Sequence, residues 1–222
     1  MNINKSKISY ITAMLIFGSI GLFVKFINMP SAQVVFARTI IGSIFLIFML
    51  FIKGKTMNKA AILKNLPILT LLGITLASSW LLLFEAFKYT TVGIATVLYY
   101  LAPVIVFILS PILFKEKLTI KKIIGITSAI LGMIIINFSP ISGLEPKRGM
   151  ICAIVSAFLY ATLIILNKQL KNINGVDTTI SQLVIAALVI LAYLLFTNGF
   201  PTKIPTGTEI FMLVLVGVVH PG

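Results

Sequence analysis

Arg38 and Glu85 are the residues whose chemistry contrasts most with their surroundings, because each lies in a long run of apolar residues. An ionisable side chain costs at least ~2.5 kcal/mol near the centre of a membrane helix, so its presence there indicates a function. We predict that the two residues pair in an external vestibule, where Glu85 accepts a proton or a substrate amine. Lys25 and Lys88 either join this vestibule or extend their side chains to the membrane interface.

Pro103 marks a second candidate site, near the middle of another apolar run. Proline cannot donate a hydrogen bond to the carbonyl of Tyr99, and its ring clashes with that turn of the helix. A freed carbonyl at the membrane midplane is tolerated where protein or a water-filled cavity receives it. The residues predicted to line a solute-binding wall with Pro103 are Tyr99, Tyr100, Ser78, Ser79 and Trp80. Alternatively, the proline is an ordinary membrane-helix residue and the polar side chains bond across helices as packing.

Residues for catalysis or metal binding are too few to form a site. The chain holds one histidine, one cysteine and five carboxylates, and of the carboxylates only Glu85 is expected inside the membrane. Acids, bases, nucleophiles or metal ligands cannot converge from this set. No glycine loop that could cradle a phosphate is present, which argues against a nucleotide-driven pump. We expect no enzyme, no catalytic residue, no metal and no cofactor. The histidine, His220, could join a proton-coupled site.

The elements that must position these residues are membrane helices. Hydrophobic residues make up 59% of the chain and charged residues 10%, whereas soluble domains are ~45–50% apolar and ~25% charged. A bilayer core ~30 Å thick needs ~20 mostly apolar helical residues, and such runs follow one another along the chain. The expected fold is an all-α, polytopic membrane helix bundle. Its predicted spans are 8–27, 32–52, 66–87, 92–114, 121–138, 149–167, 179–197 and an incomplete one from 209 to the end.

The charge distribution predicts how the spans are oriented. The chain has 18 basic residues against 5 acidic ones, a net charge of +13. If the N-terminus is cytoplasmic, twelve lysines fall in inside loops and five basic residues outside, with Arg38 within a span. The positive-inside rule therefore predicts a cytoplasmic N-terminus in the cell membrane. Because topology explains the charge, no nucleic-acid partner is expected. The expected partners are the lipid bilayer and a small-molecule substrate, and the sequence leaves a homo-oligomer open.

The chain shows a weak internal repeat at an offset of 144 residues. This shift aligns residues 37–42 with 181–186 and residues 69–73 with 213–217. We predict a first five-helix repeat at 1–140 and an incomplete second one at 149–222. Because five is odd, the second copy enters the membrane from the opposite side, so the repeats are inverted. A C-terminal truncation that removes roughly 60 or more residues is expected from this offset. The alternative is a re-entrant or interfacial last segment.

Two stripes of small residues predict close helix packing. Gly125, Ser128, Ala129 and Gly132 fall on one face of the fifth predicted span. Ala153, Ala157 and Ala161 do the same on the sixth. Small residues let membrane helices approach closely, so both stripes are interpreted as packing faces and neither as a site.

Several motifs together resemble the EamA-type members of the drug/metabolite transporter superfamily. They are the run EAFKYTTVGIA at 85–95, LAPV at 101–104, KEKL at 115–118, and Gly125 and Gly132. Such proteins are similar to this chain in their two five-helix halves, a proline-bearing fourth helix, and an acidic residue, here Glu116, before a glycine-spaced fifth helix. The resemblance implies a ten-helix inner-membrane carrier, often an exporter of amino acids or other small metabolites. The end at Gly222 departs from that pattern.

Two functional classes remain. One is a secondary transporter, an exporter of small metabolites across the cytoplasmic membrane by alternating access, which the truncation could inactivate. The other is a non-transporting integral membrane protein that acts by helix packing or regulation. An inverted repeat favours the transporter, because alternating access moves one bundle against the other around a midplane site.

Overall fold

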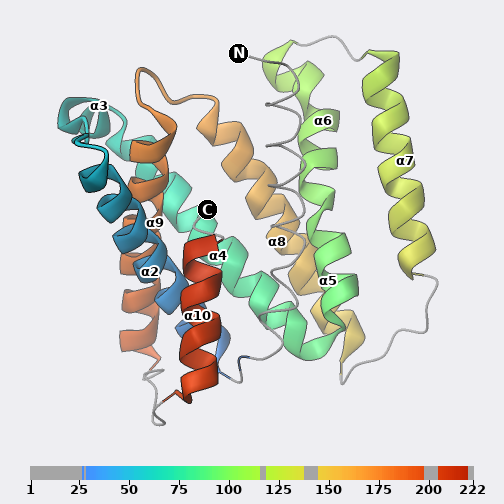
Figure 1. Ribbon diagram of the computed structural model, residues 1–222. Helices are drawn as coiled ribbons and strands as arrows, with labels where there is room; N and C mark the ends of the chain where they lie inside the picture. The colour runs from blue at the N-terminus through green and yellow to red at the C-terminus, as the bar shows by residue number, and fades with distance from the viewer. Residues whose placement is uncertain (1–26, 28, 116–118, 138–144, 198–204, 220–222) are drawn as a thin grey trace. The chain divides into compact units, whose positions relative to one another are not determined.

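The computed structural model describes residues 27, 29–115, 119–137, 145–197 and 205–219, and within these ranges the secondary structure is helical. Among the described residues, five helices are long and apolar enough to cross a membrane, counting Val92–Phe114 as one. The predicted all-α, polytopic membrane bundle is therefore confirmed (Figure 1). The helices are α2 (Ser31–Ile52), α3 (Lys59–Lys64), α4 (Leu66–Tyr89), α5 (Val92–Tyr99), α6 (Leu101–Phe114), α7 (Ile120–Asn137), α8 (Pro146–Asn167), α9 (Gly175–Phe196) and α10 (Gly207–Val219).

The predicted spans match these helices closely. The prediction 32–52 corresponds to α2, and 121–138 corresponds to α7. The largest difference is at α9, which begins at Gly175 where the sequence predicted 179. The earlier start is set by Asn174, whose side chain caps the helix by accepting a hydrogen bond from the Asp177 amide at 2.8 Å. Residues 8–26 of the first predicted span lie outside the described residues.

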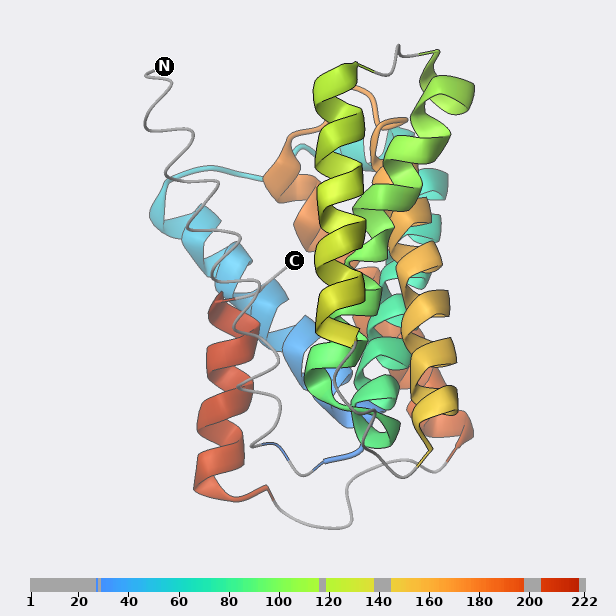
Figure 2. The same ribbon diagram turned by 90° about the vertical axis from the view of Figure 1, so that its right-hand side faces the viewer.

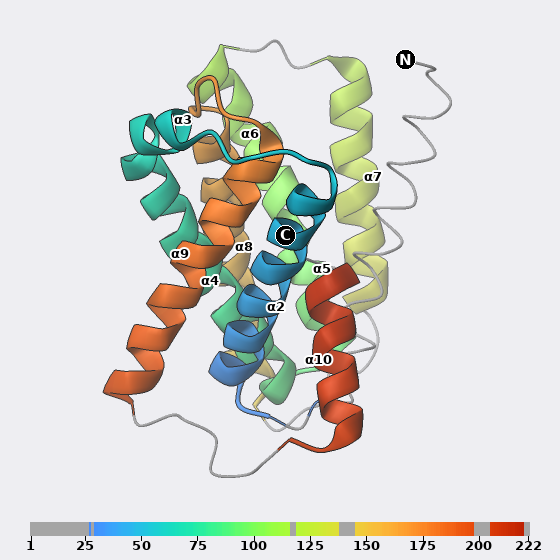
Figure 3. The same cartoon turned by 60° about the vertical axis from the view of Figure 1, so that its left-hand side comes forward.

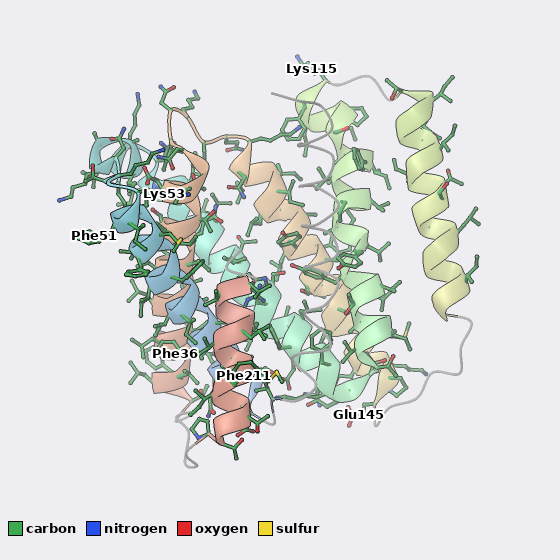
Figure 4. All side chains as sticks on the ribbon, in the orientation of Figure 1. Phe36, Phe51, Lys53, Lys115, Glu145 and Phe211 are labelled. Carbon is green, nitrogen blue, oxygen red and sulfur yellow. The ribbon has the colours of Figure 1, made fainter. Side chains whose placement is uncertain are left out.

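Large apolar side chains on the outer faces of the helices indicate a lipid environment. Phe48 is 56% exposed, Phe51 82% and Phe196 90%. Figure 4 shows Phe51 projecting away from the ribbon of α2. A soluble protein would have to cover such residues, whereas hydrocarbon chains solvate them at no cost.

The chain forms two compact units that interleave along the sequence. The first unit contains residues 1–59 and 174–222, and the second contains residues 60–173. The described helices of the first unit are α2, α9 and α10. Helices α4 to α8 belong to the second unit.

In the first unit, α2 packs against both α9 and α10, and Figure 3 shows it lying between them. Helix α10 approaches α2 closely at Gly217, where an added Cβ would lie 2.7 Å from Ile41 Cγ2. Val35 of α2 and Leu183 of α9 are fully buried in this unit. The interface therefore combines branched apolar side chains with one glycine that admits the neighbouring helix.

In the second unit, α4 and α8 form the central pair, with α5 and α6 packed on α8 and α7 alongside α5 and α6 (Figure 2). An added Cβ at Gly149 would lie 2.8 Å from Thr90 Cβ and 2.9 Å from its backbone nitrogen, so the two backbones meet there. Ala153, Ala157 and Ala161 are at most 1% exposed. The predicted packing stripe on the sixth span is thus confirmed.

The predicted packing stripe on the fifth span, which contains Gly125 and Gly132, has a different outcome. Gly125 and Ser128 on α7 are exposed, and no described residue lies within 4 Å of a Cβ built at Gly125 or Gly132. The described part of the chain therefore does not supply the close partner that the stripe predicted. Helical spacing places small residues on a common face, but it does not determine which face turns towards a neighbour.

Candidate functional site

The fourth span is interrupted close to its middle. Helix α5 ends at Tyr99 and α6 begins at Leu101, with Tyr100 at φ −70° and ψ 0° between them. The Tyr100 amide still donates to the Thr96 carbonyl at 3.0 Å. Pro103, in the first turn of α6, has no amide hydrogen to donate to the Tyr99 carbonyl. This is the hydrogen bond that the sequence predicts to be lost, and it lies beside the interruption at Tyr100.

A second proline in the same span leaves its helix continuous. Pro111 lies inside α6 and cannot donate to the Phe107 carbonyl four residues earlier. The Ser110 hydroxyl donates to that carbonyl instead, at 3.0 Å. A neighbouring serine often re-satisfies a carbonyl that proline has freed in a membrane helix. The break at Tyr100 is therefore a property of that position, and proline alone does not produce it.

Three tyrosines gather beside the break. The ring of Tyr99 lies 6.4 Å from that of Tyr100 and 5.1 Å from that of Tyr160 on α8, measured between centroids. Tyr100 is 41% exposed. Close by in sequence, the Thr96 hydroxyl is buried without a hydrogen-bond partner among the described residues. Aromatic faces and a free hydroxyl together can receive a ligand that has both apolar and polar groups.

The candidate residues of α4 reach the same stretch of α8. The Ser79 hydroxyl donates to the Ser156 carbonyl at 3.0 Å, and the Ser156 hydroxyl donates to the Ser79 carbonyl at 2.7 Å. Ser156 and Tyr160 are one helical turn apart. Helix α8 therefore joins the region of Ser79 on α4 to Tyr99 on α5. On either side of Ser79, Ser78 is half-buried and Trp80 is 4% exposed.

Sequence reasoning missed two members of this arrangement, Ser156 and Tyr160. Both are polar residues within the apolar run of the sixth predicted span. A polar residue inside a membrane span is the signal that could have identified them.

Arg38 lies in the first unit and is 1% exposed. Buried polar residues accompany it on α2, where the Thr39 hydroxyl donates to the Phe36 carbonyl at 2.8 Å and the Ser43 hydroxyl to the Thr39 carbonyl at 2.6 Å. On α9, Gln182 is also buried, with 7% of its surface exposed. A fully buried guanidinium inside a membrane span is costly, which keeps Arg38 a candidate for function.

Glu85 binds a neighbour on its own helix. Its Oε2 lies 2.8 Å from Lys88 Nζ, and the two side chains are 30% and 44% exposed. Arg38 belongs to the first unit and Glu85 to the second, so the predicted pairing of these residues stays a prediction. Lys25, Glu116 and His220 lie outside the described residues. Within the described ranges, no group of three His, Cys, Asp or Glu residues could hold a metal ion.

The fold defines a class of protein, a multi-pass helical membrane protein whose fourth span is broken beside a cluster of tyrosines. Residues 5–138 match the model of the EamA-like transporter family. The chain belongs to this family, and it is a membrane transporter.

Relatives in bacteria and archaea agree with this assignment. The chain is 31% identical to the uncharacterized transporter YxxF of Bacillus subtilis, covering 97% of this chain and 69% of that protein. It is 23% identical to the uncharacterized transporter YoaV of the same organism, covering 83% and 64%. An uncharacterized transporter of Archaeoglobus fulgidus is 28% identical over 48% of this chain and 38% of its own length. A solved crystal structure superposes with a TM-score of 0.73 at 17% identity, over 94% of this chain and 72% of the other, which shows a shared fold.

Proposed function

We propose that this chain belongs to a secondary transporter that exports a small polar or amphipathic metabolite across the cytoplasmic membrane by alternating access. The observation that carries the proposal is the interruption at Tyr100, with the rings of Tyr99 and Tyr160 5.1 Å apart beside it. Interrupted helices are the usual sites of solute binding in secondary transporters, and Pro103 leaves the Tyr99 carbonyl without its helical hydrogen bond at this point. A scaffold that acted only through helix packing would gain nothing from the break.

The proposed binding wall consists of the broken fourth span and the adjoining part of α4. Pro103, Tyr99 and Tyr100 come from the break, and Ser78 and Trp80 come from α4. Arg38, in the first unit, and Glu85, in the second, are each proposed to take part in translocation. Glu85 is the proposed proton acceptor, because it is a half-buried carboxylate near the end of a membrane span, and Lys88 Nζ lies 2.8 Å from its Oε2.

The repeat organisation is part of the same proposal, with a five-helix repeat at 1–140 and an incomplete second repeat at 149–222. The bounds of two helices support it. Helix α2 runs from Ser31 to Ile52 and α9 from Gly175 to Phe196, so that α9 begins and ends 144 residues after α2. The sequence repeat has the same offset. At this offset Arg38 corresponds to Gln182, and both residues are buried.

The experiment that tests the proposal measures export by this chain in everted membrane vesicles, against a panel of labelled amino acids and related metabolites. An aromatic contact in a buried site contributes about 1.5 kcal/mol, and about 1.4 kcal/mol corresponds to a tenfold change in affinity. Removing an aromatic ring that contacts the solute should therefore lower uptake at least tenfold. We therefore expect Tyr99→Ala and Tyr160→Ala to lose transport. Phe158→Ala is the matched control, because Phe158 lies on the same helix as Tyr160 and is 55% exposed. Equal activity of all three variants would contradict the site.

A further inference from the structure

The segment between α2 and α4, residues 53–65, carries a concentrated positive charge at the membrane surface. It joins two membrane-spanning helices, so it lies at the boundary between lipid and water. It contains no aspartate or glutamate, and its lysines are all exposed. These are Lys53, Lys55, Lys59 and Lys64. Figure 4 shows Lys53 at the end of α2 from which this lysine segment continues into α3.

Hydrogen bonds hold the lysine segment in place before and after α3. The Asn58 amide donates to Asp177 Oδ2 at 3.0 Å. At the other end, Asn65 Nδ2 donates to the Lys171 carbonyl at 2.9 Å, and the Lys171 amide donates to Asn65 Oδ1 at 3.1 Å. Asn65 is 4% exposed and Asp177 is fully buried. The lysines therefore project from an ordered backbone, which lowers the entropy cost of binding a partner.

Among the described residues, Asp177 is a carboxylate that contacts this segment, and it does not neutralise the surface of the segment. Asp177 Oδ2 accepts hydrogen bonds from the Asn58 amide and from Asn174 Nδ2, the latter at 2.7 Å. The Asp177 side chain is fully buried, whereas the lysine side chains are exposed. The carboxylate is therefore not on the exposed surface that carries the lysine ammonium groups. The positive charge of the lysine segment is thus available to an external anion.

Helix α3 presents a mixed face to its surroundings. Ala61, 9% exposed, and Asn65 are spaced by four residues and turn inward. Lys59 and Leu63 have the same spacing on the outward side, and Leu63 is 67% exposed. Leu66, at the start of α4, is 45% exposed. A cation and apolar side chains side by side match the two parts of a phospholipid, its anionic headgroup and its acyl chains. A free phosphate ion would leave Leu63 in water.

We propose that the lysine segment is a binding site for anionic phospholipids. The ammonium groups of Lys53, Lys55, Lys59 and Lys64 contact headgroup phosphates, and Leu63 enters the boundary of the acyl chains. Each lysine near an anionic membrane surface strengthens binding by roughly fivefold. The site is independent of which solute the transporter carries.

The test uses the chain purified in a neutral detergent, with thermal unfolding followed by the fluorescence of Trp80, the single tryptophan, which is 4% exposed. Dioleoylphosphatidylglycerol is titrated into the micelles, with dioleoylphosphatidylcholine and glycerol phosphate in separate arms. We expect a saturable rise in unfolding temperature with phosphatidylglycerol alone. In K59Q/K64Q the apparent Kd for this lipid should rise roughly 25-fold.

Two further variants separate charge at this site from charge in general. K88Q/K147Q removes the same charge from residues outside the lysine segment and should keep the response of the unmodified chain. K59R/K64R keeps the charge and should keep the response as well. The proposal is overturned if phosphatidylcholine or glycerol phosphate gives the same stabilisation, if K59Q/K64Q and K88Q/K147Q respond alike, or if K59R/K64R loses the response.

Discussion

Buried hydroxyl groups in this protein differ in whether they have a hydrogen-bond partner. A single residue whose buried hydroxyl has none is a candidate for binding solute. Ser79, Ser156 and Ser110 each donate to a backbone carbonyl within the described structure. The Thr96 hydroxyl, one turn before the break at Tyr100, has no such partner there. A buried hydroxyl left without a partner costs about 1–3 kcal/mol. This cost is recovered if a bound solute supplies the missing hydrogen bond.

Glu85 provides a test of proton coupling at the residue scale. Glu85→Gln keeps the size of the side chain but removes the group that would take up and release a proton. We expect its transport to become independent of pH, measured as initial rates in vesicles between pH 5.5 and 8 at a fixed membrane potential. Glu145→Gln is the control, because Glu145 also pairs with a basic residue three positions away, Arg148, at 3.5 Å. Retention of the full pH dependence in Glu85→Gln would exclude this role.

At the scale of elements, the second unit is organised around the contact between α4 and α8. Both ends of α8 carry a cation over an aromatic ring of a neighbouring helix. Arg148 lies 4.4 Å from the ring centroid of Tyr89, the last residue of α4, and Lys168 lies 3.9 Å from that of Phe114, the last residue of α6. Such contacts contribute about 0.5–2 kcal/mol each. They fix where α8 ends against its neighbours, and so help to set the height at which Tyr160 faces Tyr99.

The glycines of α8 and α7 should respond oppositely to the same substitution. Gly149→Ala places a Cβ within 3 Å of Thr90, including its backbone nitrogen, so the helices must separate. We expect it to lower the free energy of unfolding by about 1–3 kcal/mol. Gly125→Ala meets no described atom within 4 Å and should leave stability unchanged or slightly higher. Unfolding in mixed detergent micelles measures both. Equal destabilisation by the two changes would show that α4 and α8 do not meet at Gly149.

The contact between Asn65 and Lys171 gives a prediction for the ends of α4 and α8. Asn65→Ala removes three hydrogen bonds, to the Ala61 carbonyl and to both backbone groups of Lys171. We expect a loss of about 1–3 kcal/mol, because the Lys171 groups are left without this partner. Hydrogen exchange at residues 168–173 should accelerate accordingly. Thr56→Ala, at an exposed position of the lysine segment, is the control and should leave the exchange rates unchanged.

At the scale of the whole molecule, the chain passes between its two units at residues 59–60 and again at 173–174. Each unit therefore contains helices from both predicted repeats. The first unit combines α2 with α9 and α10, and the second combines α4 to α7 with α8. A compact unit is defined by packing and a repeat by ancestry of the sequence, so the two divisions of the chain need not coincide.

The predicted orientation of the molecule can be tested directly. In a Cys152→Ser background, which removes the single cysteine, Thr56→Cys and Lys147→Cys place thiols on opposite sides of the membrane. We expect a membrane-impermeant maleimide added to intact cells to label position 147 and not position 56, because the lysine-rich loops stay in the cytoplasm. Both positions should react after the cells are permeabilised. Labelling of position 56 in intact cells would reverse the topology.

The sequence by itself determined the class of protein, the positions of the described spans and the hydrogen bond that Pro103 removes from one of them. These follow from local properties. A run of about 20 apolar residues must be helical in a bilayer, because its backbone groups find no water there. The proline at 103 likewise removes a hydrogen bond wherever its helix lies. For that reason α2 and α7 fall within one residue of their predicted bounds.

Only the tertiary structure decided which residues meet. Tyr160 faces Tyr99 across 61 positions of the chain, and Lys171 binds Asn65 across 106. The small residues of α8 pack closely, whereas Gly125 of α7 meets no described neighbour, although both stripes have helical spacing. The physical reason is that spacing specifies a face of a helix, but the choice of neighbour depends on how all the helices pack together.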